Sequence, residues 1–269
     1  MTQRLLLKIR YNGAGFVGWQ VQKNGKSVQE QMQDAIEEIF GQRVGVTGCS
    51  RTDSGVHALE YCLCFDPPRE MELKRIPFAL NSVLPGDISV LSCEEVPMDF
   101  HPRYSAVAKE YLYRFYDGFA PDPFKRGLAF HERKSLNAEL MDQAAKAFLG
   151  THDFKAFMST GSKIEDTVRT IHYSRVERSG NEVTFRVVGD GFLYNMVRIM
   201  AGTLLFVSMG RIAPTDLPKI IAQGDRSQCG KTMPPYGLYL NKVYYDEKEV
   251  PHESTELGGR KFCAGGRTN

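Results

Sequence analysis

Hydrophobic and polar positions follow two distinct periods along the first hundred residues. Every second residue of 5–11 is apolar, which is typical of a strand with a buried face. Ser27 and Glu30 form a capping-box pattern, and apolar residues at helical spacing follow them, so we expect a helix to begin there. Further strands are expected at 43–48, 59–66 and 88–96, with a short helix at 73–83.

The second half of the chain repeats this order of patterns. Apolar and polar residues alternate over 109–116, which places three aromatic side chains on one face of the expected strand. A helix is expected at 136–149, a hairpin at 168–178 and 182–188, helices near 192–209 and 214–223, and a last strand at 238–246. Two such halves predict an α+β protein whose two lobes share a mixed sheet, with a cleft between them.

Length and composition agree with a two-lobed protein. The chain has 269 residues, of which 42% are hydrophobic, enough to bury a substantial core. We expect an N-terminal lobe at 1–105 and a C-terminal lobe at 106–246. Residues 247–269 are polar, glycine-rich and unpatterned, so we expect a poorly ordered tail.

Charge and cysteine usage limit the classes of partner. The net charge of +2 gives no overall bias toward nucleic acid, so a basic binding surface would need its cations concentrated on one face. No apolar run is long enough to span a bilayer, and the first residues show no signal-peptide pattern. The six cysteines include no C-x-x-C pair, which argues against a zinc site and favours free thiols in a reducing cytoplasm.

The segment S-R-T-D-S-G-V-H-A at 50–58 holds the strongest candidate for chemistry. It combines the Asp53 carboxylate, the Arg51 cation and the flexible Gly55 in one polar turn that leads into a strand. A carboxylate beside a cation at the mouth of a strand can be held ionised and exposed. By itself, however, Asp-Ser-Gly is also ordinary turn chemistry.

The same segment resembles the signature of the TruA-type tRNA pseudouridine synthases. The opening Y-N-G-A-G-F-V-G-W-Q-V-Q at 11–22 also resembles that family's N-terminal motif. The resemblance continues, in the family's order, through 27–30, 100–106, 109–111, 168–171, 191–198 and 234–240. Because these blocks cover nearly the whole chain in order, a chance match is implausible.

This resemblance implies a fold and an activity. The fold is the pseudouridine synthase fold, in which two RRM-like (ferredoxin-like) lobes share a mixed, mostly antiparallel sheet. The activity is isomerisation of uridine to pseudouridine in the anticodon stem-loop of tRNA, at positions 38–40. The family implies a cytoplasmic homodimer that needs no cofactor and no metal, with one RNA lying across both subunits.

The resemblance also assigns roles to individual residues. Asp53 is the expected nucleophile, although the sequence leaves open whether it attacks the ribose, attacks the base or deprotonates the ribose. Arg198 is expected to pair with Asp53, since a guanidinium among apolar helix residues needs an anionic partner. Tyr111 and Leu238 are expected to line the uridine pocket, although periodicity alone would place both in the core. Arg51 is expected to help flip the target base out of the RNA stack.

Further RNA contacts are expected where cations and aromatic rings alternate. The candidates are Phe100, His101, Arg103, Tyr104 and Lys163.

The chain departs from the family pattern at a few positions. Asn12 stands where the family usually has Asp, and Ser50 stands where it often has Gly. Glu165 and Asp166 make a usually neutral or basic loop acidic.

Three other functions compete with this reading. The acidic loop is the one sequence feature that favours a paralogue acting on ribosomal RNA. A non-catalytic RNA-binding module would not need the set of Asp53, Tyr111 and Arg198. A nucleotide-binding metabolic enzyme is suggested by the glycines of 11–18, but the segment lacks a phosphate-loop pattern.

Overall fold

The N-terminal lobe follows the order strand, helix, strand, strand, helix, strand in this computed structural model, which describes residues 3–159, 161 and 164–253. Its elements are β1 (Arg4–Tyr11), α1 (Val28–Phe40), β2 (Thr47–Gly48), β3 (His57–Phe65), α2 (Ile76–Val83) and β4 (Ile88–Val96). In space the strands lie in the order β4-β1-β3-β2, and each neighbouring pair is antiparallel. This is the ferredoxin-like arrangement.

The C-terminal lobe repeats that arrangement with additions. Its elements are β5 (Ala108–Asp117), β6 (Phe130–Glu132), α3 (Ala138–Ala145), β7 (Gly150–Asp153), β8 (Val168–Ser179), β9 (Glu182–Gly189), α4 (Met196–Ser208), α5 (Leu217–Gln223) and β10 (Leu238–Tyr244). Here the order β10-β5-β9-β8 corresponds to β4-β1-β3-β2 of the first lobe, and its pairs are again antiparallel. The edge strand β7 extends the sheet beyond β8.

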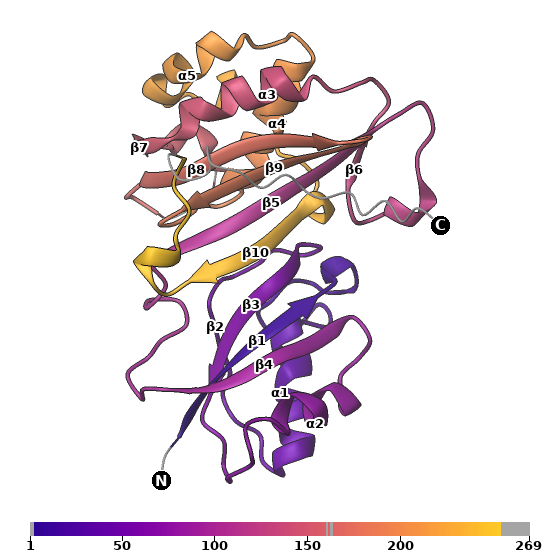
Figure 1. The fold of residues 1–269 in the computed structure, drawn as a ribbon, viewed down its shortest axis with the longest axis vertical. Coiled ribbons are helices and arrows are strands. Elements are labelled where there is room, and N and C mark those ends of the chain that lie inside the picture. The colour runs from indigo at the N-terminus through magenta and orange to yellow at the C-terminus, as the bar shows by residue number, and fades with distance from the viewer. Residues whose placement is uncertain (1–2, 160, 162–163, 254–269) are drawn as a thin grey trace, which may run out of the picture.

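The two lobes join where β10 pairs with β3 (Figure 1). This pairing is parallel and covers two residue pairs, Tyr239 with His57 and Leu240 with Ala58. It is possible because β2 is short and pairs only with Leu63 and Cys64, near the far end of β3. The β5–β6 pair is also parallel, while the others are antiparallel. The prediction of an α+β fold with a mixed, mostly antiparallel sheet is therefore confirmed.

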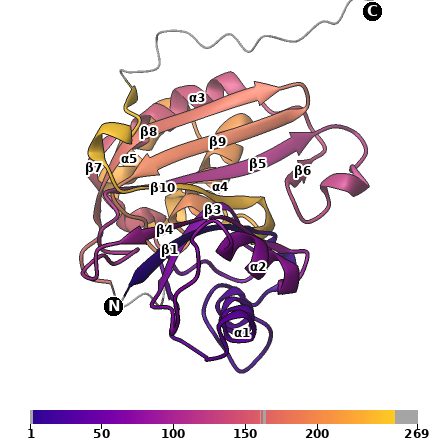
Figure 2. The same ribbon diagram turned by 60° about the horizontal axis from the view of Figure 1, so that its bottom comes forward.

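The helices lie over opposite ends of this sheet. Both views place α1 and α2 on the N-terminal lobe, at the end of the molecule away from α3 (Figures 1 and 2). α1 begins where the capping pattern predicts, because the Ser27 Oγ accepts a hydrogen bond of 3.2 Å from the backbone N–H of Glu30. No helix within the described ranges is long and apolar enough to cross a membrane.

Some element bounds differ from the sequence prediction. The expected strand at 43–48 shrinks to β2, because amide side chains of α1 donate to the carbonyls of Val44 and Val46 in place of a partner strand. The expected helix near 192–209 begins at Met196, because the preceding Asn195 has a φ of 61° in the left-handed region, which a helix cannot include. The expected helix at 136–149 is shorter, since the chain turns into a 3₁₀ segment after α3.

The beginning of the predicted tail packs against the C-terminal lobe. Residues Glu247–Glu249 form a 3₁₀ turn, and Val250 is buried. The Glu253 carboxylate accepts a hydrogen bond from the Lys146 ammonium. Residues 254–269, the rest of that predicted tail, lie outside the described residues.

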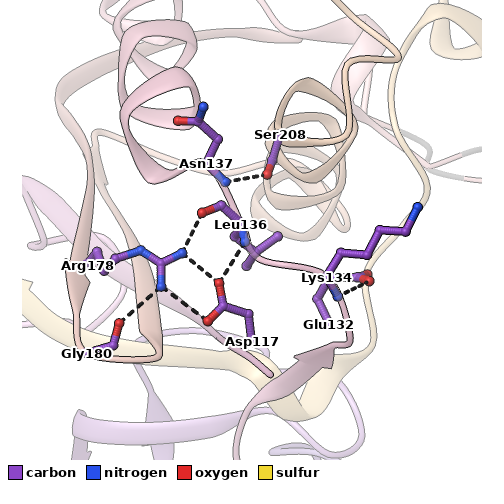
Figure 3. Close-up of polar contacts among 8 residues, drawn as sticks. All are labelled: Asp117, Glu132, Lys134, Leu136, Asn137, Arg178, Gly180 and Ser208. Carbon is purple, nitrogen blue, oxygen red and sulfur yellow. Dashed lines mark hydrogen bonds and ion pairs between the residues drawn. The ribbon is translucent and has the colours of Figure 1, made fainter. Parts of the chain in front are cut away.

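An ion pair between an exposed arginine and a buried carboxylate connects the helices of the C-terminal lobe to the sheet (Figure 3). Arg178, at the end of β8, holds the Asp117 carboxylate of β5 at 2.6 Å and 3.2 Å. The same carboxylate accepts the backbone N–H of Leu136 at 2.7 Å, just before α3. The next N–H, that of Asn137, donates to the Ser208 Oγ of α4 at 2.8 Å. Two strands and two helices therefore meet at this cluster.

Candidate active site

A cavity of about 390 Å³, called the main cavity below because it holds the residues of the sequence motifs, lies where the two lobes join. Asp53 reaches it from the N-terminal lobe, and Tyr111 of β5 and Arg198 of α4 reach it from the C-terminal lobe. Sheet register explains part of this convergence. Leu240 of β10 pairs with Tyr111 on one side and with Ala58 of β3 on the other, so the strand start that follows the Asp53 turn lies level with Tyr111.

The Asp53 turn is held by the glycine-rich segment at 11–22. Gly18 pairs with Asp53 in an isolated bridge and has a φ of 117°, a conformation that favours glycine. A Cβ at Gly18 would lie 2.7 Å from the carbonyl oxygen of Thr52. The Trp19 N–H donates to that carbonyl at 3.1 Å. The Tyr11 hydroxyl is hydrogen bonded to the Thr52 Oγ1 at 2.8 Å. The segment that resembles the family's opening motif is therefore a cradle for the Asp53 turn.

Asp53 and Arg198 form an ion pair across the lobe junction. Their Oδ2 and Nη1 atoms are 3.6 Å apart, and the side chains are 41% and 15% exposed. Burial raises the pKa of the Asp53 carboxyl, and the positive charge of Arg198 acts against that rise. The cation therefore favours the ionised form of a carboxyl whose pKa is raised by burial.

The Arg198 guanidinium is fixed in place by neighbouring groups. Its Nε donates to the Met233 carbonyl at 2.6 Å, and its Nη1 donates to the Asn195 Oδ1 at 2.5 Å. The Asn195 side chain in turn donates to the Ser159 Oγ at 2.9 Å. These bonds hold Arg198 toward Asp53 before any substrate binds. The sequence assigned no role to Asn195, and its left-handed backbone had no clear signal in the residue pattern.

Tyr111 and Leu238 form the apolar side of the cavity. Both side chains are 8% exposed, and both line the cavity as predicted. The Tyr111 ring packs edge-on against Phe192, with ring centroids 5.0 Å apart. Its hydroxyl is hydrogen bonded to the Ser50 Oγ at 3.2 Å, a contact that a glycine at position 50 could not make. Burial raises the pKa of Tyr111 to about 12, so the phenol is neutral at neutral pH.

Arg51 lies at the rim of the cavity with an exposed side chain. Its guanidinium has no hydrogen bond or ion pair among the residues that the structure describes. Arg51 also lines a second, shallower pocket beside the cavity. Its exposed side chain therefore lies beside the cavity, and the RNA contact expected from the sequence stays a prediction.

The loop at 100–104 separates into a structural part and an exposed part. The Phe100 ring packs against Tyr245, with centroids 5.0 Å apart, and does not line the main cavity. The His101 Nδ1 accepts the backbone N–H groups of Arg103 and Tyr104 at 3.1 Å and 3.2 Å. Arg103 lines the cavity, and Tyr104 is 77% exposed. His101 thus shapes a turn that presents a cation and an aromatic ring.

The acidic loop has a local structural role. The Asp166 carboxylate accepts the backbone N–H of Val168 at 3.0 Å, at the start of β8, and lies 3.8 Å from the Arg169 guanidinium. The neighbouring Ile164 lines the cavity. Lys163, which the sequence singled out for RNA contact, lies outside the described residues.

Lys109 is a cavity residue that the sequence analysis left without a role. Its side chain lines the cavity two positions before Tyr111, on the same face of β5. Burial lowers the pKa of its ammonium, and the nearby Arg103 charge lowers it further. Within the described residues the ammonium has no hydrogen bond or ion pair. The sequence signal that could have identified Lys109 was its position two residues before Tyr111, which places both side chains on the same face of a strand.

Comparison with known protein families identifies the family of this chain. The family model described as tRNA pseudouridine synthase matches residues 8–105 and 144–246. The chain belongs to the tRNA pseudouridine synthase family. Asp53 and Arg51 fall in the first matched segment, Arg198 and Leu238 fall in the second, and Tyr111 lies between the two.

Relatives within the tRNA pseudouridine synthase family span almost the whole chain. The tRNA pseudouridine synthase A of Ruminiclostridium cellulolyticum is 45% identical over 244 residues, which is 90% of this chain and 100% of the relative. The tRNA pseudouridine synthase A of Halalkalibacterium halodurans is 44% identical over 254 residues, 94% and 97% of the two chains. A solved Cbf5-Nop10-Gar1 complex matches at 12% identity and a TM-score of 0.33, over 87% of this chain and 57% of that one.

The donor groups near the site do not form a metal centre in the part of the chain described. There, no three His, Cys, Asp or Glu side chains group in a way that could hold a metal ion. Five described cysteines are free thiols, and Cys49, which lies just before the Asp53 turn, is fully buried.

Proposed function

We propose that this chain isomerises uridine to pseudouridine in tRNA, at positions 38–40 of the anticodon stem-loop. The observation that carries the proposal is the Asp53–Arg198 ion pair in a cavity that Tyr111 also lines. Family membership and relatives named tRNA pseudouridine synthase A support the substrate class.

The reaction places clear demands on the site. The bond between uracil N1 and ribose C1′ breaks, a bond between C5 and C1′ forms, C5 loses a proton and N1 gains one. The product is an isomer, so the chemistry needs a nucleophile and proton transfers but no net oxidant or reductant. We assign Asp53 as the nucleophile, with Arg198 keeping its carboxyl ionised.

Tyr111 and Leu238 are assigned to hold the uracil ring. Because the pKa of Tyr111 is about 12, its neutral phenol is better suited to hydrogen bonding and ring contact than to removing the C5 proton from the bound uridine. Its fixed hydroxyl, bonded to Ser50, gives the ring a defined position.

Three cations near the cavity are assigned to the RNA backbone and to base flipping. Arg51, Arg103 and Lys109 all line the cavity, and phosphate groups are the anions that an RNA would bring to them. We assign Arg51 to base flipping, because its exposed side chain lies at the rim of the cavity, close to Asp53 in the chain. We further propose a cytoplasmic homodimer. One RNA could then contact the basic sites of both subunits, although the net charge of each chain is only +2.

Ribosomal RNA remains the second candidate substrate. Its support was the acidic loop, but the structure gives Asp166 a local role at the start of β8. Mapping pseudouridines in tRNA and ribosomal RNA from a deletion strain separates the two substrates. Loss of pseudouridine from the anticodon stem-loop supports the proposal, and loss from ribosomal RNA alone contradicts it.

The direct biochemical test is release of tritium from tRNA labelled at C5 of uridine. We expect tritium release from a tRNA that carries a target uridine and none when that uridine is replaced by cytidine. Absence of release from every tRNA with uridine at positions 38–40 would contradict the proposed activity.

A further inference from the structure

A second pocket adjoins the proposed uridine cavity. It has a volume of about 300 Å³ and shares Ser50, Arg51 and Arg103 with the main cavity. Its other walls include Gln20 from the cradle segment and His101 and Tyr104 from the following loop. The two hollows are therefore neighbours on one surface, separated by the Arg51 turn.

The chemistry of the second pocket suits a nucleotide. The His101 and Tyr104 rings lie 4.3 Å apart by centroid, at an angle of 34°, and Tyr104 presents most of its surface to solvent. An exposed aromatic ring is a platform on which any nucleobase can stack. Arg51 and Arg103 supply positive charge for a phosphate, and the exposed Gln20 amide can donate to and accept from a base edge.

The turn that carries the Tyr104 ring is held in place before RNA arrives. Two backbone N–H groups bond to the His101 ring, and the Ser105 Oγ accepts the His101 N–H at 3.1 Å. The Ser105 N–H donates to the His101 carbonyl at 2.8 Å. These contacts fix the turn from both ends, so little order has to be gained on binding.

We propose that this pocket binds the nucleotide that is covalently next to the target uridine, with its base stacked on Tyr104. The inference rests on the proposed function, because it takes the main cavity as the uridine site. We infer adjacency in the same strand from the shared wall, because the two pockets meet at Arg51 and Arg103 and consecutive nucleotides are joined by one phosphate. The enzyme would then hold two unstacked nucleotides, not one.

The test combines a protein variant with abasic RNA. Binding constants are measured for wild type and Tyr104→Ala with an intact stem-loop and with stem-loops abasic at the 5′ neighbour, the 3′ neighbour or the pairing partner of the target uridine. We expect Tyr104→Ala to weaken binding of the intact RNA by about tenfold. An abasic site at one strand neighbour should weaken wild-type binding similarly, and the two changes together should cost little more than either alone.

Two control variants isolate the ring. Tyr104→Phe keeps the stacking surface and should bind like wild type. Phe78→Ala removes another exposed ring, on α2 and outside both pockets, and should also bind like wild type.

The outcomes separate this inference from the proposed function. The inference is overturned if the affinity losses from Tyr104→Ala and from the abasic site multiply at both the 5′ and the 3′ neighbour. It is also overturned if the Tyr104→Ala loss is reduced only in the RNA that is abasic at the pairing partner. Wild-type turnover on the intact stem-loop, measured in the same series, tests the proposed function independently, because it does not depend on which base stacks on Tyr104.

Discussion

At the scale of single residues, the site depends on the Asp53 carboxyl, whose pKa is subject to two opposing effects. Burial raises the pKa of Asp53, and Arg198 opposes that rise from 3.6 Å away. Arg198 is itself held by the Met233 carbonyl and by Asn195. Its position is therefore set by the protein, so its effect on Asp53 is present in the free enzyme.

Removing the Arg198 charge should shift the pH dependence of activity. The Arg198 cation lowers the pKa of Asp53, so Arg198→Ala should raise that pKa and move the acidic limb of the kcat/KM profile to higher pH. The rate at neutral pH should fall as well. Arg211→Ala, which removes an arginine packed on Phe206 outside the cavity, is the control and should keep the wild-type profile. An acidic limb that does not move in Arg198→Ala would show that the two groups are not coupled in solution.

Arg51 can be tested as a base-flipping residue through the pairing of the substrate. Unstacking costs a few kcal/mol, and less for a mismatched base. Arg51→Ala should therefore lose more single-turnover rate on a stem-loop with a paired target uridine than on one with a mismatched target. Equal losses on the two RNAs would leave Arg51 as a phosphate contact, with a reduced salt dependence of binding.

Lys109 should act as a phosphate contact and not as a structural residue. Lys109→Met should weaken RNA binding and reduce the slope of log K against log salt by about one. Lys109→Arg keeps the charge and should keep most of the slope. A wild-type slope in Lys109→Met, measured by filter binding over a salt series, would remove Lys109 from the RNA interface.

At the scale of elements, alternation and capping predicted the main strands and helices. β1, β3, β5, β9 and β10 appear where apolar alternation placed them. The pattern did not predict β6 and β7, which have three and four residues, too few for a period to show. It also overextended the strand that became β2, because the competing bonds come from amide side chains of α1, distant in sequence.

The candidate site could be predicted only in part from the sequence. Motif resemblance identified Asp53, Tyr111 and Arg198, and the structure brings all three to one cavity. Periodicity alone would have placed Tyr111 in the core, and it is indeed almost buried. Lys109 and Asn195 were missed, because their roles depend on what faces them across the lobe junction and on a left-handed backbone, neither of which a residue pattern records.

The Asp117–Arg178 pair should dominate the stability of the contact between sheet and helices. Arg178→Met removes both guanidinium hydrogen bonds from the Asp117 carboxylate, which keeps the N–H of Leu136, and should lower the free energy of unfolding by about 2 kcal/mol. Arg43→Met breaks an exposed pair with Asp34 and Glu37 and should cost less than about 1 kcal/mol. Both losses can be measured by urea denaturation at neutral pH.

The pH dependence of that loss has a defined sign. Hydrogen bonds from Arg178 hold the pKa of Asp117 below its ordinary value, so the pair stabilises the folded state above the unfolded pKa of about 4. This contribution is lost as the pH falls through the folded pKa. The difference between wild type and Arg178→Met should therefore shrink below about pH 4. A constant difference across that range would contradict the assigned ion pair.

At the scale of the whole molecule, two lobes of the same topology share one sheet and one cavity. Their strands are joined by two residue pairs between β3 and β10, and the boundary predicted at 105 lies in the connection between β4 and β5. Asp53 comes from one lobe, and Arg198, Tyr111 and Leu238 come from the other. The complete site therefore exists only when the lobes are docked, which links catalytic competence to the junction of the sheet.

The most direct test of this account is the single-turnover rate of Asp53→Asn on a tRNA that carries a target uridine. The amide has the shape of the carboxylate but can neither attack as a nucleophile nor carry its negative charge. We predict that pseudouridine formation falls by more than about a thousandfold, while RNA affinity and thermal stability stay close to those of wild type. Pseudouridine formed at a rate near that of wild type, with wild-type contamination excluded, would remove Asp53 from the mechanism.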